Sequence, residues 1–250
     1  MTTITWWGLM WCLLPIALVS GIYFIWHGKP SEVLISSARM VIQLVGVGYV
    51  LVFLFDSPSP WTSLAVVTLM LAVASWIAIR PVRGQPGYFQ PALLALLISV
   101  SFHLLLSLKL VMAAETWYTP NLFIPLAGMY LANTMNALSL SAERYHAELR
   151  QGNPVAQARL TAFNAAMIPQ INGLLAVGLV ALPGMMTGQI LSGISPLIAV
   201  RYQIMIMAMV LGCSGVGSAI LLWSLRNTPL AHTLKPHQPQ KGKEPAAPDA

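Results

Sequence analysis

Charged residues are scarce in this sequence. Asp, Glu, Lys and Arg make up only 8% of its 250 residues, whereas apolar residues make up 57%. A soluble domain carries about a quarter charged residues, because its surface must be hydrated. The composition therefore excludes a soluble globular domain and indicates an integral membrane protein.

Cysteines and catalytic motifs are also missing or few. The chain has two cysteines, both in apolar runs, which gives neither a disulfide framework nor a cysteine-ligated metal site. It has no phosphate-binding Gly-x4-Gly-Lys-Ser/Thr loop, no His-Glu-x-x-His and no Gly-x-Ser-x-Gly. We therefore predict that the chain is not an enzyme, and we expect no nucleic-acid partner.

Apolar runs of about 20 residues recur along the chain, each long enough to cross a roughly 30 Å hydrocarbon core as an α-helix. They predict an all-α protein with seven transmembrane helices. The runs are Trp6–Trp26, Val33–Phe55, Trp61–Ile79, Pro91–Met112, Leu122–Leu140, Ala165–Leu191 and Leu197–Trp223. We therefore expect one polytopic transmembrane domain over residues 1–226, in contact with membrane lipid.

Lys and Arg occur in alternate loops. They follow the first, third and fifth predicted spans and recur in the tail, while the loops between contain none. Because basic loops stay on the cytoplasmic side, this alternation predicts an N-terminus outside and a C-terminus in the cytoplasm. The proline-rich residues 227–250 are too polar to bury a core, so we expect a disordered cytoplasmic tail.

The fifth loop, about residues 141–164, mixes charged and apolar residues. Gly152-Asn-Pro154 is predicted to divide it into two short amphipathic helices. A solvated connector is one interpretation. The other is a docking element, because an exposed apolar helix face needs a partner or the bilayer surface. The residues assigned to docking and coupling are Glu148, Leu149, Arg150, Gly152, Pro154 and Leu160.

The sixth run contains Pro183-Gly-Met-Met-Thr-Gly-Gln189. Proline lacks the amide hydrogen of a continuous helix and glycine tolerates unusual backbone angles, so the run is predicted to break here. Broken backbone at membrane depth is tolerated only where it is buried in protein or lines a water-filled cavity. The break therefore indicates a transport path. Met185 and Met186 would offer thioethers to a soft metal there, or would simply fill space.

Polar side chains within the spans are expected to face the bundle interior or a pore. A central Arg in lipid costs roughly 2.5 to 3.5 kcal/mol on insertion scales. Snorkelling and interhelical hydrogen bonds remain alternative roles for these side chains. The residues predicted to line or shape the path are Arg39, Gln43, Asn133, Asn136, Asn172, Pro183, Gly184, Met185, Met186 and Gln189, with Met185 and Met186 as candidate metal ligands.

Three strings, Arg39-Met-Val-Ile-Gln43, Asn133-Thr-Met-Asn136 and Leu182-Pro-Gly-Met-Met-Thr-Gly188, occur in this order. They resemble the FetB-like iron-export permease family of ABC transporters, which has plant aluminium-tolerance relatives. The resemblance implies the membrane permease subunit of an ATP-binding-cassette exporter in the bacterial inner membrane.

Further expectations follow from this resemblance. It implies a homodimer, a separate ABC ATPase subunit that uses ATP and Mg, and export of iron or a related metal ion. No cofactor is expected on this chain itself. The connector here, Glu148 to Pro154, is shorter than is usual in the family.

Two other functions stay open at this point. One is a permease of the same class for an organic or sugar-linked substrate, which would need aromatic and hydrogen-bonding walls more than thioethers. The other is a membrane scaffold or sensor that transports nothing. Transport assays with both substrate types would separate the first alternative from metal export.

Overall fold

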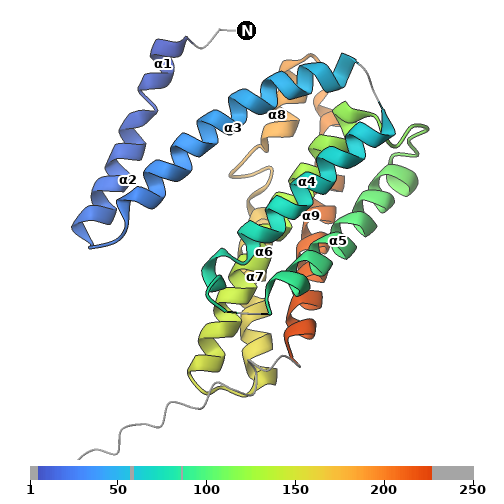
Figure 1. Cartoon of the computed structure of the whole chain (residues 1–250). Helices are drawn as coiled ribbons and strands as arrows, with labels where there is room; N and C mark the ends of the chain where they lie inside the picture. The colour runs from blue at the N-terminus through green and yellow to red at the C-terminus, as the bar shows by residue number, and fades with distance from the viewer. Residues whose placement is uncertain (1–4, 57–58, 86, 227–250) are drawn as a thin grey trace, which may run out of the picture. The chain divides into compact units, whose positions relative to one another are not determined.

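The computed structural model describes residues 5–56, 59–85 and 87–226, so the predicted tail at 227–250 lies outside the described residues. The elements of this described part are helices, which confirms the predicted all-α class. They fall into two units, residues 1–58 and residues 59–250, and each unit is described by itself (Figure 1).

The first unit holds three helices: α1 (Trp6–Met10), α2 (Leu13–Ile25) and α3 (Pro30–Asp56). α2 and α3 pack against each other as a helical hairpin. The tight turn between them is closed by the Gly28 amide, which donates to the Tyr23 carbonyl at 2.7 Å.

The second unit contains the other helices. They are α4 (Pro60–Ala78), the 3-10 turn η1 (Arg80–Val82), α5 (Phe89–Leu105), the π-helical turn η2 (Leu106–Val111), α6 (Pro120–Arg150), α7 (Val155–Ala176), α8 (Gly184–Leu191) and α9 (Pro196–Leu225). α5 continues directly into η2, so the two form one rod.

Helix α6 is the centre of the second unit, because it packs against α4, α5, α7 and α9. α4 runs parallel to it: the Ser63 hydroxyl donates to the Tyr118 carbonyl at 2.9 Å near the start of both helices. Farther along, the Ser139 hydroxyl donates to the Ala78 carbonyl at 2.8 Å. We call the two ends of this bundle the Pro120 end and the Gly152 end.

Helix α9 approaches α5 and α6 closely, and glycines make that approach possible. A Cβ at Gly212 would lie 2.5 Å from His103 Nε2, and a Cβ at Gly217 would lie 2.7 Å from Thr134 Cγ2. His103 is itself held, because its Nδ1 lies 2.7 Å from the Ser99 carbonyl and donates to it. Small residues at such crossings let membrane helices come close enough for dispersion contacts.

Five described helices are long and apolar enough to cross a membrane. They cover Trp7–Ile25, Pro30–Val52, Pro60–Ala78, Phe89–Val111 and Pro196–Leu225, which match the predicted spans one to four and seven. The predicted fifth span lies within α6, where amides and terminal charges lower the hydropathy. The predicted sixth span is not one helix, since α7 ends at Ala176 and α8 begins at Gly184.

The predicted break at Gly152-Asn-Pro154 is confirmed, but the two helices that it separates are long and not short. α6 continues to Arg150 and α7 starts at Val155, so this segment forms the adjoining ends of two long helices. Gly152 takes φ +84° just beyond the end of α6, a backbone angle that favours glycine. Pro154 then precedes α7, where its missing amide hydrogen costs nothing.

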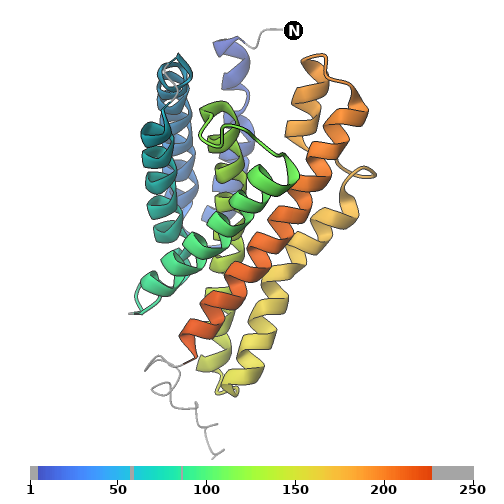
Figure 2. The same ribbon diagram turned by 90° about the vertical axis from the view of Figure 1, so that its right-hand side faces the viewer.

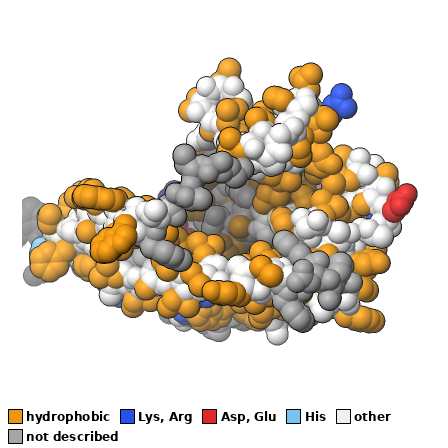
Figure 3. All heavy atoms as spheres, turned by 90° about the horizontal axis from the view of Figure 1, so that it is seen from above, with side chains coloured by type: hydrophobic (Ala, Val, Ile, Leu, Met, Phe, Trp, Pro, Cys, Tyr) orange, Lys and Arg blue, Asp and Glu red, His pale blue; other side chains and the backbone are white. Residues whose placement is uncertain are grey.

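The outside of the molecule is strongly apolar. In the view of Figure 3, hydrophobic side chains cover much of the visible surface and charged side chains are few. Large side chains such as Leu105, Leu110 and Trp61 are 62%, 78% and 78% exposed. A surface of this kind is stable against lipid and not against water.

The Gly217 crossing gives a direct test of the helix packing. We expect Gly217→Ala to lower the midpoint of thermal unfolding in detergent, at a cost of about 1 to 3 kcal/mol, because the new methyl group would collide with Thr134. Gly215→Ala on the same helix is the control, since its Cβ would meet Met167 at an ordinary 3.6 Å. Equal midpoints for both variants would contradict a close crossing at Gly217.

Candidate functional site

A cavity of about 340 Å³ lies between α6, α7 and α9, with the start of α8 at its edge. None of its lining residues is charged. Two kinds of polarizable or polar group face it, side-chain amides and thioethers. The amides come from Asn133, Asn136, Gln170 and Gln203, and the thioethers come from Met129, Met185 and Met207.

The amide of Gln203 is the most constrained of these groups. The Gln203 side chain on α9 is 6% exposed, and its buried Oε1 has no hydrogen-bond partner among the described residues. Burying an unpaired carbonyl oxygen costs about 1 to 3 kcal/mol. A water molecule or a polar ligand in the cavity would remove this cost.

Asn133 is oriented by its own helix. Its Nδ2 donates to the Met129 carbonyl at 2.8 Å, which leaves the Oδ1 atom to accept from elsewhere. Asn136 lies one turn farther along α6 and lines the same cavity. The structure thus brings together five of the predicted path residues: Asn133, Asn136, Pro183, Gly184 and Met185.

The two candidate metal ligands are separated. Met185 lines the amide-rich cavity, whereas Met186 lines a neighbouring, almost wholly apolar pocket of about 460 Å³ with Leu174, Val200 and Ile204. Met185 and Met186 are consecutive on a helix, so their side chains point about 100° apart.

The unwound segment lies earlier than the sequence predicted. It covers residues 177–183, and Pro183 caps α8 instead of opening the break, so both thioethers sit on helix and not in broken backbone. The segment closes on itself: the Val180 amide donates to the Ala176 carbonyl at 2.8 Å, and the Gly178 amide donates to the Ala181 carbonyl at 3.0 Å. Gly178 permits this turn with φ +82°.

The other predicted path residues lie elsewhere. Asn172 is exposed on α7, and Gln189 on α8 has a buried Oε1 without a partner among the described residues, but neither lines the cavity. Arg39 and Gln43 belong to α3 of the first unit, whereas the cavity lies wholly in the second.

The ten residues predicted to line or shape the path omit four of the seven amide and thioether residues of the cavity: Met129, Gln170, Gln203 and Met207. A signal for two of them was present. Met129 precedes Asn133 by four residues and Met207 follows Gln203 by four, so each thioether shares a helix face with an amide.

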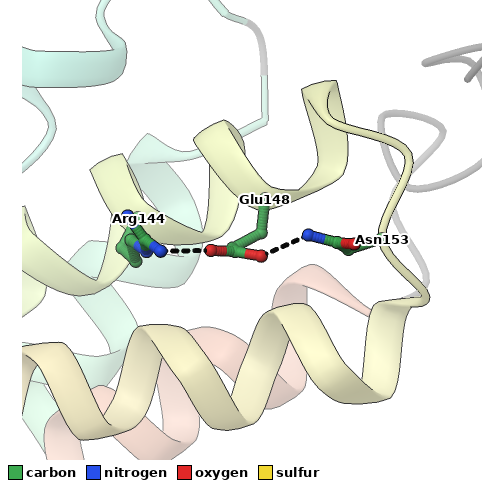
Figure 4. A network of polar contacts seen from close by, with 3 residues as sticks. All are labelled: Arg144, Glu148 and Asn153. Carbon is green, nitrogen blue, oxygen red and sulfur yellow. Dashed lines mark hydrogen bonds and ion pairs between the residues drawn. The ribbon is translucent and has the colours of Figure 1, made fainter. Parts of the chain in front are cut away.

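The connector between α6 and α7 is held by a small polar network at the Gly152 end. The Glu148 carboxylate pairs with the Arg144 guanidinium and accepts a hydrogen bond from the Asn153 side chain (Figure 4). Glu148 and Leu149 are each 4% exposed, so they stabilise the corner from inside. Nearby, burial and then the charge of Arg150 lower the pKa of His146, which favours a neutral imidazole at pH 7.

Of the predicted docking residues, Arg150, Gly152 and Pro154 are exposed at this corner. Leu160 is 62% exposed but lies one turn into α7, on the wall of a groove shared with α9. Of the residues predicted to dock a partner, those at the tip of the α6–α7 hairpin are therefore accessible at the surface.

Metal-binding clusters of the usual kind are absent from the part of the chain that the structure describes, where no three or more His, Cys, Asp or Glu side chains come together. Any cation in the cavity would meet only neutral amides and thioethers.

The cavity, the interrupted α7–α8 segment and the apolar exterior belong to a chain that matches a known family over residues 6–228. That family is the uncharacterised protein family UPF0014. The chain belongs to UPF0014. The match confirms the resemblance seen in the sequence, because the similar proteins include a probable iron export permease and a plant protein named ALUMINUM SENSITIVE 3.

Three curated relatives illustrate the UPF0014 match. A UPF0014 membrane protein of Synechocystis is 35% identical, covering 74% of this chain and 79% of the relative. The probable iron export permease protein FetB of Escherichia coli is 30% identical, covering 76% of this chain and 78% of the relative. The protein ALUMINUM SENSITIVE 3 of Arabidopsis thaliana is 31% identical, covering 77% of this chain and 76% of the relative. No solved structure matches the chain.

The UPF0014 relatives are named as membrane proteins, and five described helices of this chain are long and apolar enough to span a bilayer. This chain is a multi-pass integral membrane protein. The family itself carries no assigned function, so the function must be argued from the cavity and the corner.

Two adjacent residues at the corner test its structure. We expect Leu149→Glu to prevent folding, because it would bury a carboxylate in the core, whereas Arg150→Glu should fold normally on the exposed surface. Gel filtration of the purified variants in detergent shows whether each has folded, and we expect aggregation only for Leu149→Glu. A monodisperse Leu149→Glu protein would contradict the burial of this side chain.

Proposed function

We propose that this UPF0014 protein is the membrane permease subunit of an ATP-driven exporter, with the amide and thioether cavity as part of its transport path. The observation that carries the proposal is the cavity itself, a polar-lined space within otherwise apolar helices. Uncharged polar groups at membrane depth are costly unless they hydrogen-bond to protein, water or a substrate, and the Gln203 Oε1 has no partner among the described residues.

The proposed energy source is a separate ATPase. The chain has no phosphate-binding loop, yet export against a gradient needs energy. ATP and Mg would therefore be used by an ABC ATPase partner, and this chain would hold no cofactor of its own. Support comes from the FetB relative, which is named a probable iron export permease.

The topology proposed for this role has seven spans. Five are the long apolar helices, and α6 together with the α7–α8 segment would supply the other two. The basic loops support an N-terminus outside and a cytoplasmic C-terminus. In this orientation the Gly152 end faces the cytoplasm. We further propose a homodimer in a bacterial inner membrane.

The proposed substrate is iron or a related metal ion. Thioethers from α6, α8 and α9 and side-chain amides from α6, α7 and α9 line the same cavity, which places soft sulfur donors beside hard amide oxygens. A cation of low charge fits this donor set better than a trivalent ion, because no carboxylate in the cavity lining would compensate the charge.

One observation favours a second candidate, a polar organic or sugar-linked substrate. Four amides line the cavity, and amides hydrogen-bond hydroxyl groups well. A hydroxyl-rich substrate would depend on the amides more than on the thioethers, so the same variants distinguish the two candidates.

The thioethers give the first test of the substrate. We expect Met129→Leu with Met185→Leu and Met207→Leu to lower metal efflux at least about tenfold, while the nearly conserved volume spares folding. Met186→Leu is the control, since Met186 lines the apolar pocket, and should retain efflux. The efflux of both variants is measured by loading cells with the metal and following its loss over time.

Other outcomes of this experiment have definite meanings. Unchanged metal efflux in the triple variant would overturn a thioether-lined metal path. If efflux of the metal is unchanged but Gln203→Leu abolishes uptake of a hydroxylated organic substrate into inside-out vesicles, the second candidate holds.

The hairpin tip gives a test of ATPase coupling. We expect Arg150→Glu with Gln151→Glu to fold but to lose the ATPase during co-purification, because both side chains are exposed at the only corner joining α6 and α7. Glu115→Gln, at the Pro120 end, should keep the partner bound. Full co-purification with the tip variant would place docking elsewhere.

A further inference from the structure

A second concave surface lies away from the transport cavity. It is a groove of about 870 Å³, with α9 at its base and α5 and α7 as its walls. α5 and α7 each pack against α9, and in Figure 2 they flank α9 on its two sides. The groove is near the Gly152 end, because it includes residues from the last two turns of α9 and the first turns of α7.

The walls of the groove are apolar and uncovered. Leu94 and Ile98 on α5 are 50% and 51% exposed. Phe163 on α7 and Ile220 on α9 also contribute apolar side chains to the lining of the groove. α9 is one of the helices long and apolar enough to cross a membrane, so this groove opens to the hydrocarbon of the bilayer. An acyl chain is a natural occupant of such a surface.

The end of the groove near the membrane surface is positively charged. Arg159 lines it, and the Nε atom of Arg159 is buried without a hydrogen-bond acceptor among the described residues. Trp223 lines the same end, and the Arg226 guanidinium lies 4.1 Å from the Trp223 ring centre. No acidic residue lines the groove.

We propose that this groove binds an anionic phospholipid, with an acyl chain along Ile98, Phe163 and Ile220 and the phosphate at Arg159. A phosphate would supply the acceptor that the Arg159 Nε lacks, and guanidinium to phosphate hydrogen bonds are strong. Trp223 lies where the headgroup region meets the hydrocarbon, the usual position of interfacial tryptophans.

A lipid fits this groove better than a second copy of the chain. An isologous contact would present the same groove, with Arg159 and no acidic lining residue, to itself. The charge complementarity is therefore with an anion. This inference does not depend on which substrate the cavity carries.

The test uses the full-length protein purified in detergent. Native mass spectrometry would compare binding of dioleoyl phosphatidylglycerol with dioleoyl phosphatidylcholine, which share the same acyl chains. We expect wild-type protein to prefer the anionic lipid by at least about fivefold, and Arg159→Gln to lose that preference. Arg83→Gln removes a positive charge outside the groove, so this variant should keep the preference for the anionic lipid.

A second variant removes the space instead of the charge. Ala219→Phe places a large side chain on an exposed lining position, so it should reduce binding of both lipids while the protein still folds. An unchanged lipid preference in Arg159→Gln, or unchanged binding in Ala219→Phe, would overturn the proposal. Efficient cross-linking of Ile220→Cys between two copies in membranes would also overturn it, because the groove would then be a dimer interface.

Discussion

The close approach of α9 to α5 and α6 is the constraint on which the rest of the second unit depends. In a bilayer, apolar side chains gain little by moving from lipid to protein, so helices associate through close packing and hydrogen bonds. Gly212 against His103 and Gly217 against Thr134 provide that packing here. Because these contacts hold α9 against α6, they also set the width of the cavity between α6, α7 and α9.

The interruption after α7 shapes the cavity in a way that a continuous helix could not. α7 stops at Ala176, the chain turns through residues 177–183, and α8 starts again beside α9. The turn satisfies its own backbone through hydrogen bonds to the Ala176 and Ala181 carbonyls. Residues 177–182 of the turn do not line the cavity, so its polar character comes from amide side chains such as Asn133 and Gln203.

The Gly152 end of the second unit carries two features, an ion pair with a buried carboxylate and an apolar groove lined by one arginine. At the Gly152 end, the buried Glu148 carboxylate pairs with Arg144 and accepts from Asn153, which ties the end of α6 to the turn before α7. A rigid corner of this kind can transmit a push from a docked partner into both long helices. The groove lined by Arg159 at the same end would place a lipid against α7 and α9, two of the helices that line the amide and thioether cavity.

The sequence alone was enough to determine the membrane character, the all-α class and the family, because hydropathy and short motifs are local properties. It also located an interruption near Pro183, although the unwound residues proved to be 177–183. Which side chains meet was decided by the tertiary structure. Met185 lines the cavity that Asn133 and Asn136 also line, whereas its neighbour Met186 lines the apolar pocket. Leu149 is in the core although its neighbour Arg150 is exposed. These differences depend on how far each helix is rotated about its own axis, and that rotation is set by contacts such as Gly217 with Thr134 between segments distant in sequence.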